Sequence, residues 1–282
     1  MNGFINLIKP KNMSSAYAVG MVKKKFNLPC GHMGTLDPMA SGVLPIGVGK
    51  ASRLFQYMIE KKKAYKAEFT FGKTTDTLDA EGEVTGETKV IPTLNQLENA
   101  VKSLVGEIMQ IPPDFSAKCV NGKRSYQLAR QGVKVDLPPK KIKVDKFEVV
   151  EQISDNVFTF YIECEGGTYI RALARDLAKE VGSLAYMSKL ERTKSGIFEI
   201  ENAVTFEELK NSENPEKYLI SSDRAVSFET LNLTKEQARK ILDGVFLNYG
   251  FLDGTYRVYN EGEFFGVGQV VDGILKIKSY VR

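Results

Sequence analysis

The segment from Gly31 to Leu44 contains the side chain that is best suited to chemistry, the carboxylate of Asp37. Glycines in this segment allow tight turns and a close approach of the backbone to a ligand. Pro38 restricts Asp37 to an extended conformation and supplies no N–H donor, so a loop presents the carboxylate. Such a carboxylate can act as a nucleophile or a general base. Asp-Pro pairs are also typical of ordinary turns, and the pattern alone leaves both interpretations open.

The composition of the 282-residue chain excludes several other kinds of site. It contains one histidine, His32, and three scattered cysteines, so we expect no zinc site, no multi-histidine metal centre and no disulfide framework. Neither a Gly-x-Gly-x-x-Gly pattern nor a phosphate-binding Gly-Lys-Ser/Thr loop is present, so we expect no nucleotide cofactor. The sequence therefore indicates chemistry that needs neither a metal nor a cofactor.

The sequence also bears on the cellular location. No stretch approaches the ~20 apolar residues of a membrane span. The N-terminus has neither the basic start nor the long apolar core of a secretion signal. We therefore expect a cytoplasmic protein with reduced thiols and no association with a membrane.

Basic residues are concentrated in two segments, although the formal net charge is only +4. Residues 1–75 contain 12 Lys or Arg and 3 Asp or Glu, and residues 118–146 contain 9 and 2. The rest of the chain has an excess of acidic residues. Two basic segments on an otherwise acidic chain favour a localised positive surface that binds RNA or DNA. For the Lys23-Lys24-Lys25 run alone, a solvated surface is the simpler interpretation.

Periodicity and capping predict the elements that position Asp37. A strand opens the chain and a helix capped by Ser14 or Ser15 ends near Phe26. A loop is expected over residues 29–38. The elements expected after it are a strand at 43–48, a helix at 51–59, a strand at 65–71, a helix at 93–104, strands at 141–150 and 157–164, and a helix from Thr168, as its cap, to Lys179.

Two later regions have a different character. Residues 112–142 lie between two Pro-Pro pairs and indicate an insertion with one helical stretch, Arg124–Gln131. The acidic residues 199–229 resemble a linker, and a helix from Leu233 to Gly244 and short strands follow it. We predict an α+β main domain, residues 1–225, and a small β-rich C-terminal domain, residues 226–282.

Five segments with distinctive residues follow one another along the chain. They are Lys9-Pro10 with Ser14-Ser15; Gly31–Leu44; Lys63-Ala64-Tyr65 with Thr75–Gly82; Pro112–Lys118 with Gly122, Tyr126 and Ala129-Arg130; and Gly167–Arg171 with Asp176-Leu177. In this order they resemble the motifs of TruB-type pseudouridine synthases. Asn12 and Ser14 depart from the family's opening Lys-Pro-x-Gly-x-Thr-Ser. The tail resembles a PUA domain more diffusely.

The resemblance implies a fold and a reaction. The fold is a catalytic domain with a mixed or antiparallel sheet and an RNA-binding insertion, followed by a PUA-like RNA-binding domain. The reaction is the isomerisation of uridine to pseudouridine in RNA, with Asp37 as the catalytic carboxylate. The family match pairs Arg171 with Asp37 and places Tyr65 on the target uracil, where it relays a proton. Without the resemblance, Tyr65 is an ordinary strand aromatic.

The resemblance further implies residues that bind the substrate. His32 holds the RNA loop, Tyr169 and Leu190 line the base pocket, and Asp79 orders a neighbouring loop. Without the resemblance, we would interpret His32 as a structural histidine and Leu190 as an ordinary residue of the hydrophobic core. The other implied RNA contacts are Arg53, Lys9, Lys118 and Arg130.

The chain length and the single insertion are similar to those of the family's bacterial tRNA enzymes. This similarity implies a monomer without an obligate protein partner that acts on uridine 55 in the T arm of tRNA. A non-enzymatic RNA-binding protein is the main alternative, but binding alone does not need Asp37, Tyr65 and Arg171 at these spacings. A cofactor-dependent enzyme for a small molecule is disfavoured by the missing nucleotide motifs.

Overall fold

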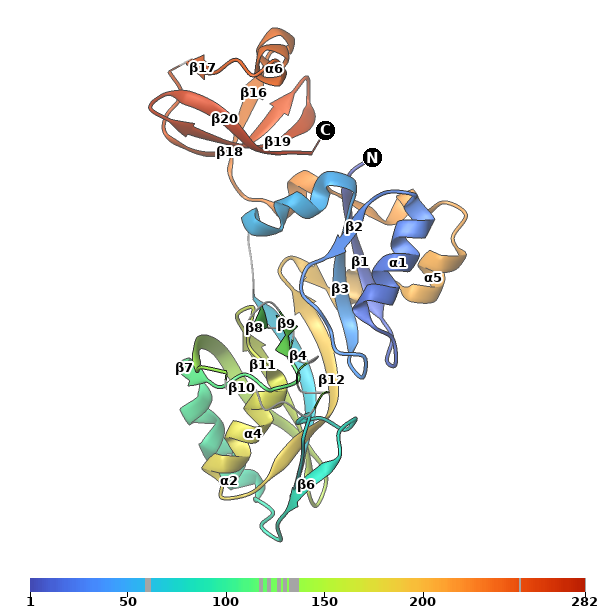
Figure 1. Cartoon of the computed structure of the whole chain (residues 1–282), viewed down its shortest axis with the longest axis vertical. Coiled ribbons are helices and arrows are strands. Elements are labelled where there is room, and N and C mark those ends of the chain that lie inside the picture. Colours follow the sequence, from blue (N-terminus) through green and yellow to red (C-terminus); the bar gives the residue numbers. More distant parts are fainter. Residues whose placement is uncertain are drawn as a thin grey trace. The chain divides into compact units, whose positions relative to one another are not determined.

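The computed structural model describes residues 1–58, 62–116, 119–120, 123–125, 128, 131, 137–248 and 250–281. The chain forms two compact units. The first unit contains residues 1–38, 42–61 and 195–282, and the second contains residues 39–41 and 62–194. Each unit therefore combines segments that are distant in the sequence (Figure 1). None of the helices within the described ranges has the length and apolar character needed to cross a membrane.

The first unit is built around β1 (Gly3–Lys9), the predicted opening strand, whose residues are nearly all buried. Its neighbours are partly parallel and partly antiparallel, so the sheet is mixed, as predicted. These strands are β3 (Ser41–Val48), antiparallel to β1; β14 (Val204–Thr205), parallel to β1; β15 (Leu219–Ser221), antiparallel to β1; and β2 (Cys30–His32), antiparallel to β3.

Helix α1 (Ser15–Phe26) confirms the predicted cap and end. The Ser14 hydroxyl accepts a hydrogen bond from the Tyr17 N–H at 3.1 Å, which satisfies one of the free donors of the first turn. Asn27 ends the helix in the left-handed conformation with φ 51°. The predicted helix at 51–59 is instead the 3₁₀ helix η1 (Gly49–Tyr57).

Two predictions for the first unit are wrong. The segment 29–38 is not all loop, because Cys30–His32 pairs with β3 as an additional strand. The acidic segment 199–229 is not a linker, because β14 and β15 pair with β1 and Phe206 and Leu209 are buried. It also contains η3 (Ile200–Asn202), α5 (Phe206–Asn211), η4 (Pro215–Tyr218) and η5 (Ser222–Ala225), and β13 (Phe198–Glu199) ends at its first residue.

The C-terminal part of the first unit is rich in strands, as predicted. Its sheet has the order β16-β18-β19-β20-β17. One buried cluster in this unit includes Phe4 and Val43 together with Val226, Val267 and Val281. The predicted domain boundary after residue 225 stays a prediction. The elements of this part are β16 (Glu229–Leu233), α6 (Lys235–Leu242), β17 (Leu247–Asn248), β18 (Gly254–Asn260), β19 (Glu263–Val271) and β20 (Ile274–Tyr280).

The second unit contains a sheet in the order β12-β4-β11-β10-β7. Alternation in β4 (Lys63–Phe71) and β11 (Val157–Cys164) buries aromatic rings, and the Phe69 and Phe160 rings stack with centroids 4.7 Å apart. The remaining strands are β12 (Ala185–Ser195), β10 (Lys140–Ser154) and β7 (Gly106–Gln110), with a separate pair formed by β5 (Lys73–Thr75) and β6 (Val84–Glu87).

Helices α2 (Leu94–Ala100), continued by η2 (Val101–Leu104), and α4 (Ile170–Glu180) pack beside each other in the second unit (Figure 1). Helix α4 also contacts β4. The prediction that Thr168 caps α4 is wrong, because Tyr169 is the cap residue and its side chain makes no capping bond.

The predicted insertion, residues 112–142, is described only in part. Strands β8 (Cys119–Val120) and β9 (Lys123–Arg124) form an antiparallel pair within it. The predicted helical stretch Arg124–Gln131 lies largely outside the described residues, as do Lys118 and Arg130.

Candidate active site

The loop that carries Asp37 is fixed on both sides of that residue. The Ser15 hydroxyl accepts from the Leu36 N–H at 2.9 Å and donates to the Leu36 carbonyl at 2.8 Å. On the other side, the Pro38 carbonyl accepts from the Asn12 N–H at 2.8 Å. Asp37 itself is half-buried between these anchors. The backbone on both sides of Asp37 is therefore fixed, and Asp37 lies outside any helix, as the Asp-Pro pattern predicts.

Lys9 contributes to the same anchor, and its predicted contact with RNA needs correction. Its side chain is completely buried, with 0% exposure. The ammonium donates to the carbonyls of Pro10 at 2.8 Å, Met13 at 2.7 Å and Pro38 at 3.3 Å. A phosphate cannot reach an ammonium in this position without displacing these bonds. Lys9 therefore holds the Asp37 loop.

The two departures from the family's opening motif are explained by the backbone. Asn12 has φ 60°, in the left-handed region where glycine is favoured and where asparagine is the most tolerated side chain. Ser14 replaces the motif's threonine and supplies the same hydroxyl as a helix cap. Both substitutions therefore preserve the geometry that fixes Asp37.

Two other predicted residues of the first unit occupy different environments. His32 is the last residue of β2, half-buried and opposite Ile46 of β3. Arg53 lies on η1 and is exposed, which is compatible with a phosphate contact. Their roles in binding RNA stay predictions.

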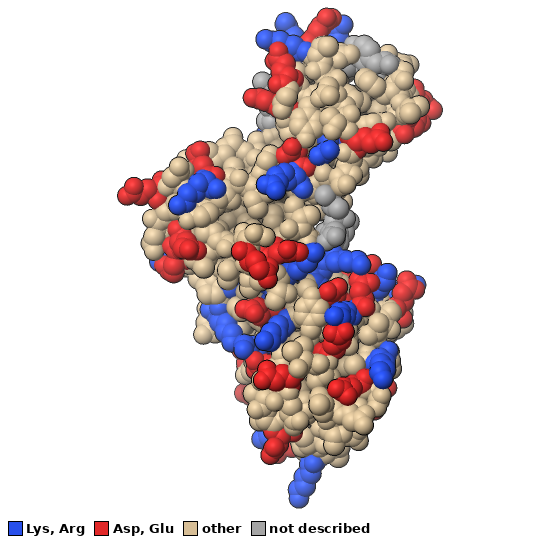
Figure 2. Space-filling model, turned by 180° about the vertical axis from the view of Figure 1, so that it is seen from behind, with Lys and Arg blue, Asp and Glu red and all other residues tan. Residues whose placement is uncertain are grey.

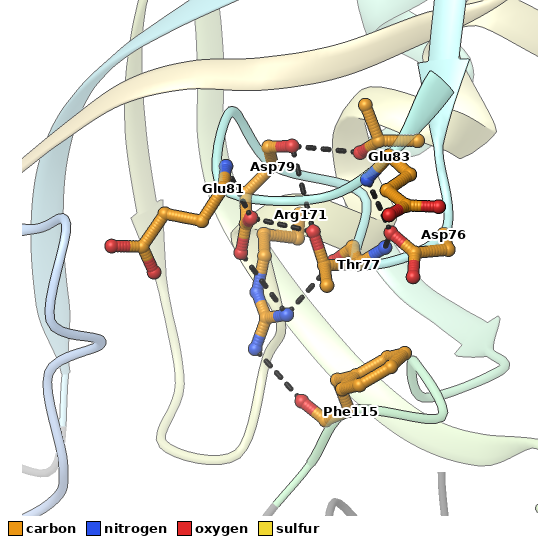
Figure 3. A network of polar contacts seen from close by, with 8 residues as sticks. Asp76, Thr77, Asp79, Glu81, Glu83, Phe115 and Arg171 are labelled. Atoms are coloured by element: carbon orange, nitrogen blue, oxygen red, sulfur yellow. Dashed lines mark hydrogen bonds and ion pairs between the residues drawn. The ribbon is translucent and has the colours of Figure 1, made fainter. Parts of the chain in front are cut away.

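In the second unit, Arg171 lies in the first turn of α4 and is 7% exposed. Its Nη1 atom is 3.3 Å from Asp79 Oδ2 and donates to the Thr77 carbonyl at 2.8 Å. Its Nη2 atom donates to the Phe115 carbonyl at 3.0 Å (Figure 3). These bonds fix the plane of the guanidinium. The predicted ion pair of Arg171 with Asp37 stays a prediction.

The loop that carries Asp79 is held by its own side chains (Figure 3). Asp79 Oδ1 accepts from the Thr77 hydroxyl at 2.6 Å and from the Glu81 N–H at 3.1 Å. Asp76 Oδ1 accepts from the N–H groups of Thr77 at 2.8 Å and Glu83 at 2.9 Å. Asp79 therefore orders this loop, as expected, and it also compensates the buried charge of Arg171.

Tyr65 and Leu190 lie on adjacent strands of the second unit, β4 and β12, and are 6% and 5% exposed. Burial, reinforced by the Arg192 guanidinium, lowers the pKa of Lys63 to about 8. Lys63 directly faces Cys164 on β11, and burial raises the pKa of that thiol to about 11. The strand that presents Tyr65 therefore begins with a largely desolvated cation.

Tyr169 is half-buried and its backbone is clamped by the side chain of Gln110. Gln110 Oε1 accepts from the Tyr169 N–H at 2.9 Å, and Gln110 Nε2 donates to the Tyr169 carbonyl at 3.1 Å. Sequence reasoning missed Gln110, because a glutamine before a Pro-Pro pair carries no signal of its partner. Asp79 differs from Gln110 in this respect, because a buried carboxylate in general needs a cation as its partner.

The basic segments are partly neutralised by neighbouring acids. Lys141, Lys143 and Lys146 pair with Glu107, Asp145 and Glu148 at 2.6, 3.6 and 2.9 Å. On the face shown in Figure 2, basic and acidic side chains are interspersed over both units. The excess of basic residues in the sequence therefore overstates the charge that these three lysines can offer to phosphates. Within the described part of the chain, no three His, Cys, Asp or Glu side chains are grouped to hold a metal ion.

Comparisons with known proteins match nearly the whole chain to one family. The family description "TruB family pseudouridylate synthase (N terminal domain)" matches residues 23–170. Two C-terminal descriptions, "tRNA pseudouridylate synthase B C-terminal domain" and "Pseudouridine synthase II TruB, C-terminal", match residues 171–233 and 230–279.

Similar curated proteins are named tRNA pseudouridine synthase B. The protein from Alkaliphilus oremlandii is 38% identical over 281 residues, covering 96% of this chain and 93% of that protein. The protein from Aquifex aeolicus is 37% identical over 284 residues, covering 99% of each.

The fold is also similar to that of solved structures. One is an H/ACA RNP bound to a substrate RNA containing 2′-deoxyuridine, with TM-score 0.72, 23% identity, and coverage of 99% of this chain and 85% of that one. Another is a Cbf5-Nop10-Gar1 complex, with TM-score 0.72, 24% identity and the same coverage. The chain therefore belongs to the TruB family of pseudouridylate synthases, and it is an enzyme that converts uridine in tRNA to pseudouridine.

Proposed function

We propose that the uridine converted by this enzyme is uridine 55, in the loop of the T arm of tRNA. The observation that carries the proposal is the similarity of the chain's length, single insertion and motifs to those of the bacterial tRNA enzymes of the family, and the fixed presentation of Asp37 supports the role of its carboxylate. Its neighbours Leu36 and Pro38 are bonded to Ser15 and Asn12, within motifs that resemble those of the T-arm enzymes. A rigid loop limits the number of ways in which the carboxylate can approach a nucleoside.

The reaction is an isomerisation that needs no added atoms. The bond between ribose C1′ and uracil N1 breaks, the base turns, and C5 bonds to C1′. C5 then loses its proton and N1 gains one, so the product has the composition of the substrate. Ionised Asp37 initiates the cleavage as the nucleophile or base.

The second unit supplies the base pocket in this proposal. Tyr65 packs against the uracil and relays the C5 proton, and Leu190 and Tyr169 line the pocket. Arg171 stabilises the negative charge of Asp37. The bonds from Arg171 to Asp79, Thr77 and Phe115 support this role, because they hold the guanidinium in one orientation.

RNA contacts position the target nucleotide. The uridine must leave its stack, which costs a few kcal/mol, and phosphate contacts offset that cost. We assign such contacts to Arg53, Lys118 and Arg130. His32 holds the RNA loop. The C-terminal residues 226–282 form a PUA-like domain that touches another part of the same tRNA. The enzyme works in the cytoplasm as a monomer without an obligate protein partner or a cofactor.

The proposal is tested with an unmodified T-arm stem-loop transcript and the purified protein. Carbodiimide labelling followed by reverse transcription locates each pseudouridine. We expect one stop, at the nucleotide directly 3′ to uridine 55, and none in a transcript that has cytidine at position 55. A stop directly 3′ to another uridine, with uridine 55 unchanged, would contradict the assignment.

A further inference from the structure

Gln110, the last residue of β7, is 1% exposed. Among the residues that the structure describes, its side chain forms hydrogen bonds with the backbone of Tyr169. Its amide has an acceptor and a donor, and they match the N–H and the carbonyl of Tyr169. Tyr169 is the cap residue of α4 and makes no capping bond with its own side chain. Gln110 therefore fixes the start of this helix from outside.

The same helix holds the segment that follows Gln110. Arg175 Nη2 donates to the Ile111 carbonyl at 2.9 Å, and Arg171 Nη2 donates to the Phe115 carbonyl at 3.0 Å. The cap residue Tyr169 and two residues of α4, Arg171 and Arg175, therefore bind residues 110–115. This segment includes the first residues of the insertion, so the helix and the root of the insertion are tied together at three points.

We propose that Gln110 is a positioning residue for the isomerisation, which holds Tyr169 and the start of α4 in register with the root of the insertion. The inference rests on the proposed function, which assigns Tyr169 and Arg171 to the uridine pocket. Without the clamp, the Tyr169 N–H loses the bond to Gln110, and the Tyr169 carbonyl keeps its bond from the Leu173 N–H at 3.1 Å but loses the one from Gln110, so the helix start relaxes toward other partners. Displacements of about 1 Å in positioning groups can cost roughly a hundredfold in rate.

The test uses Gln110→Met, which keeps the length of the side chain and removes both hydrogen bonds. Asn156→Leu is the matched control, because Asn156 Nδ2 donates to the Phe71 carbonyl at 3.1 Å in the same unit. With enzyme in excess over the T-arm stem-loop, we expect Gln110→Met to lower the single-turnover rate constant about tenfold or more. We expect the Kd for the stem-loop to change less than about threefold, and Asn156→Leu to leave both quantities near the wild-type values.

Two outcomes overturn the inference. One is a Gln110→Met rate constant equal to that of the control variant. The other, which does not depend on folding of a variant, is hydrogen exchange of the wild-type Tyr169 N–H as fast as that of the exposed Gly166 N–H. We expect the Tyr169 N–H to exchange about tenfold slower or more. If the wild-type enzyme does not modify uridine 55, the proposed function fails, and the exchange measurement still decides whether the clamp exists.

Discussion

Asp79 and Arg171 form a buried ion pair, with Asp79 Oδ2 3.3 Å from Arg171 Nη1 and side-chain exposures of 6% and 8%. They come from segments 92 residues apart in the sequence, a loop between β5 and β6 and the first turn of α4. The pair is completed by hydrogen bonds to the Thr77 and Phe115 carbonyls. A buried charge with this many partners is fixed in orientation, which is the property that the role proposed for Arg171 requires.

We predict that Asp79→Asn destabilises the enzyme by about 3 kcal/mol, because it leaves the Arg171 charge buried without its counter-ion. Urea unfolding measures the change as a lower midpoint. Glu68→Gln is the control, since it breaks the more exposed pair with Lys189, 2.8 Å long, and should cost less than about 1 kcal/mol. Equal losses in the two variants would show that the Asp79 pair is no stronger than a surface pair.

Lys9→Met tests whether Lys9 holds the Asp37 loop or contacts RNA. We expect a single-turnover rate constant lower by roughly tenfold or more, because three carbonyls lose their donor and the loop shifts. The slope of log Kd for tRNA against log salt concentration should be unchanged, because no phosphate contact is lost. A slope smaller by about 1 would support the direct phosphate contact instead.

The structure predicts opposite changes in stability for alanine substitutions at two glycines, one in the Asp79 loop and one in α1. A Cβ at Gly82 would overlap Thr77 Oγ1 and Asp76 Oδ1 and lie 3.0 Å from the Thr77 nitrogen, so Gly82→Ala should destabilise the protein by about 2 kcal/mol. Gly20 is in the middle of α1 with nothing within 4 Å of its Cβ position, so Gly20→Ala should stabilise by about 0.5–1 kcal/mol. A thermal unfolding midpoint for Gly82→Ala equal to or above that of wild type would refute the placement of Gly82.

The lowered pKa of Lys63 predicts that the stability of the protein depends on pH. Its pKa is about 8 in the folded protein against an ordinary value of 10.5. Between these values the unfolded chain binds more protons, so this group's contribution to stability rises with pH, and its full penalty is present below pH 8. The penalty is on the order of 3 kcal/mol. We expect Lys63→Met to be more stable than wild type at pH 7, with the difference narrowing toward pH 10.

The exposed Lys66 of the same strand provides the control for that experiment. Urea unfolding of Lys66→Met should differ from wild type by a small amount that is constant between pH 7 and pH 10. A constant difference for Lys63→Met as well would mean that Lys63 titrates normally in the folded protein.

The local elements of this fold could be predicted from the sequence because their signals are local. The hydroxyl of Ser14 caps α1, and the alternation at residues 65–71 and 157–164 produces β4 and β11. The pairing partners could not be predicted in this way. Short β14 and β15 pair with β1 across about 200 residues or more of sequence, a relationship that the acidic character of residues 199–229 does not indicate.

The sequence can nominate a site residue where a motif carries its own chemistry, as at Asp37, whose catalytic role stays a prediction. The sequence does not indicate the role of a residue that acts by positioning another residue. Lys9 is basic and near the N-terminus, and only its burial shows that it bonds to carbonyls instead of phosphates. Gln110 has no motif of its own, and its function depends on the backbone of Tyr169, 59 residues later.

The central claim, that the Asp37 carboxylate initiates cleavage of the glycosidic bond, is tested most directly with Asp37→Asn. The amide has the same shape but can act neither as the base nor, effectively, as the nucleophile. We predict that this variant binds the T-arm stem-loop within about threefold of the wild-type Kd and that its single-turnover rate constant falls roughly a thousandfold or more. A variant that still formed pseudouridine at a rate near that of wild type would contradict the account.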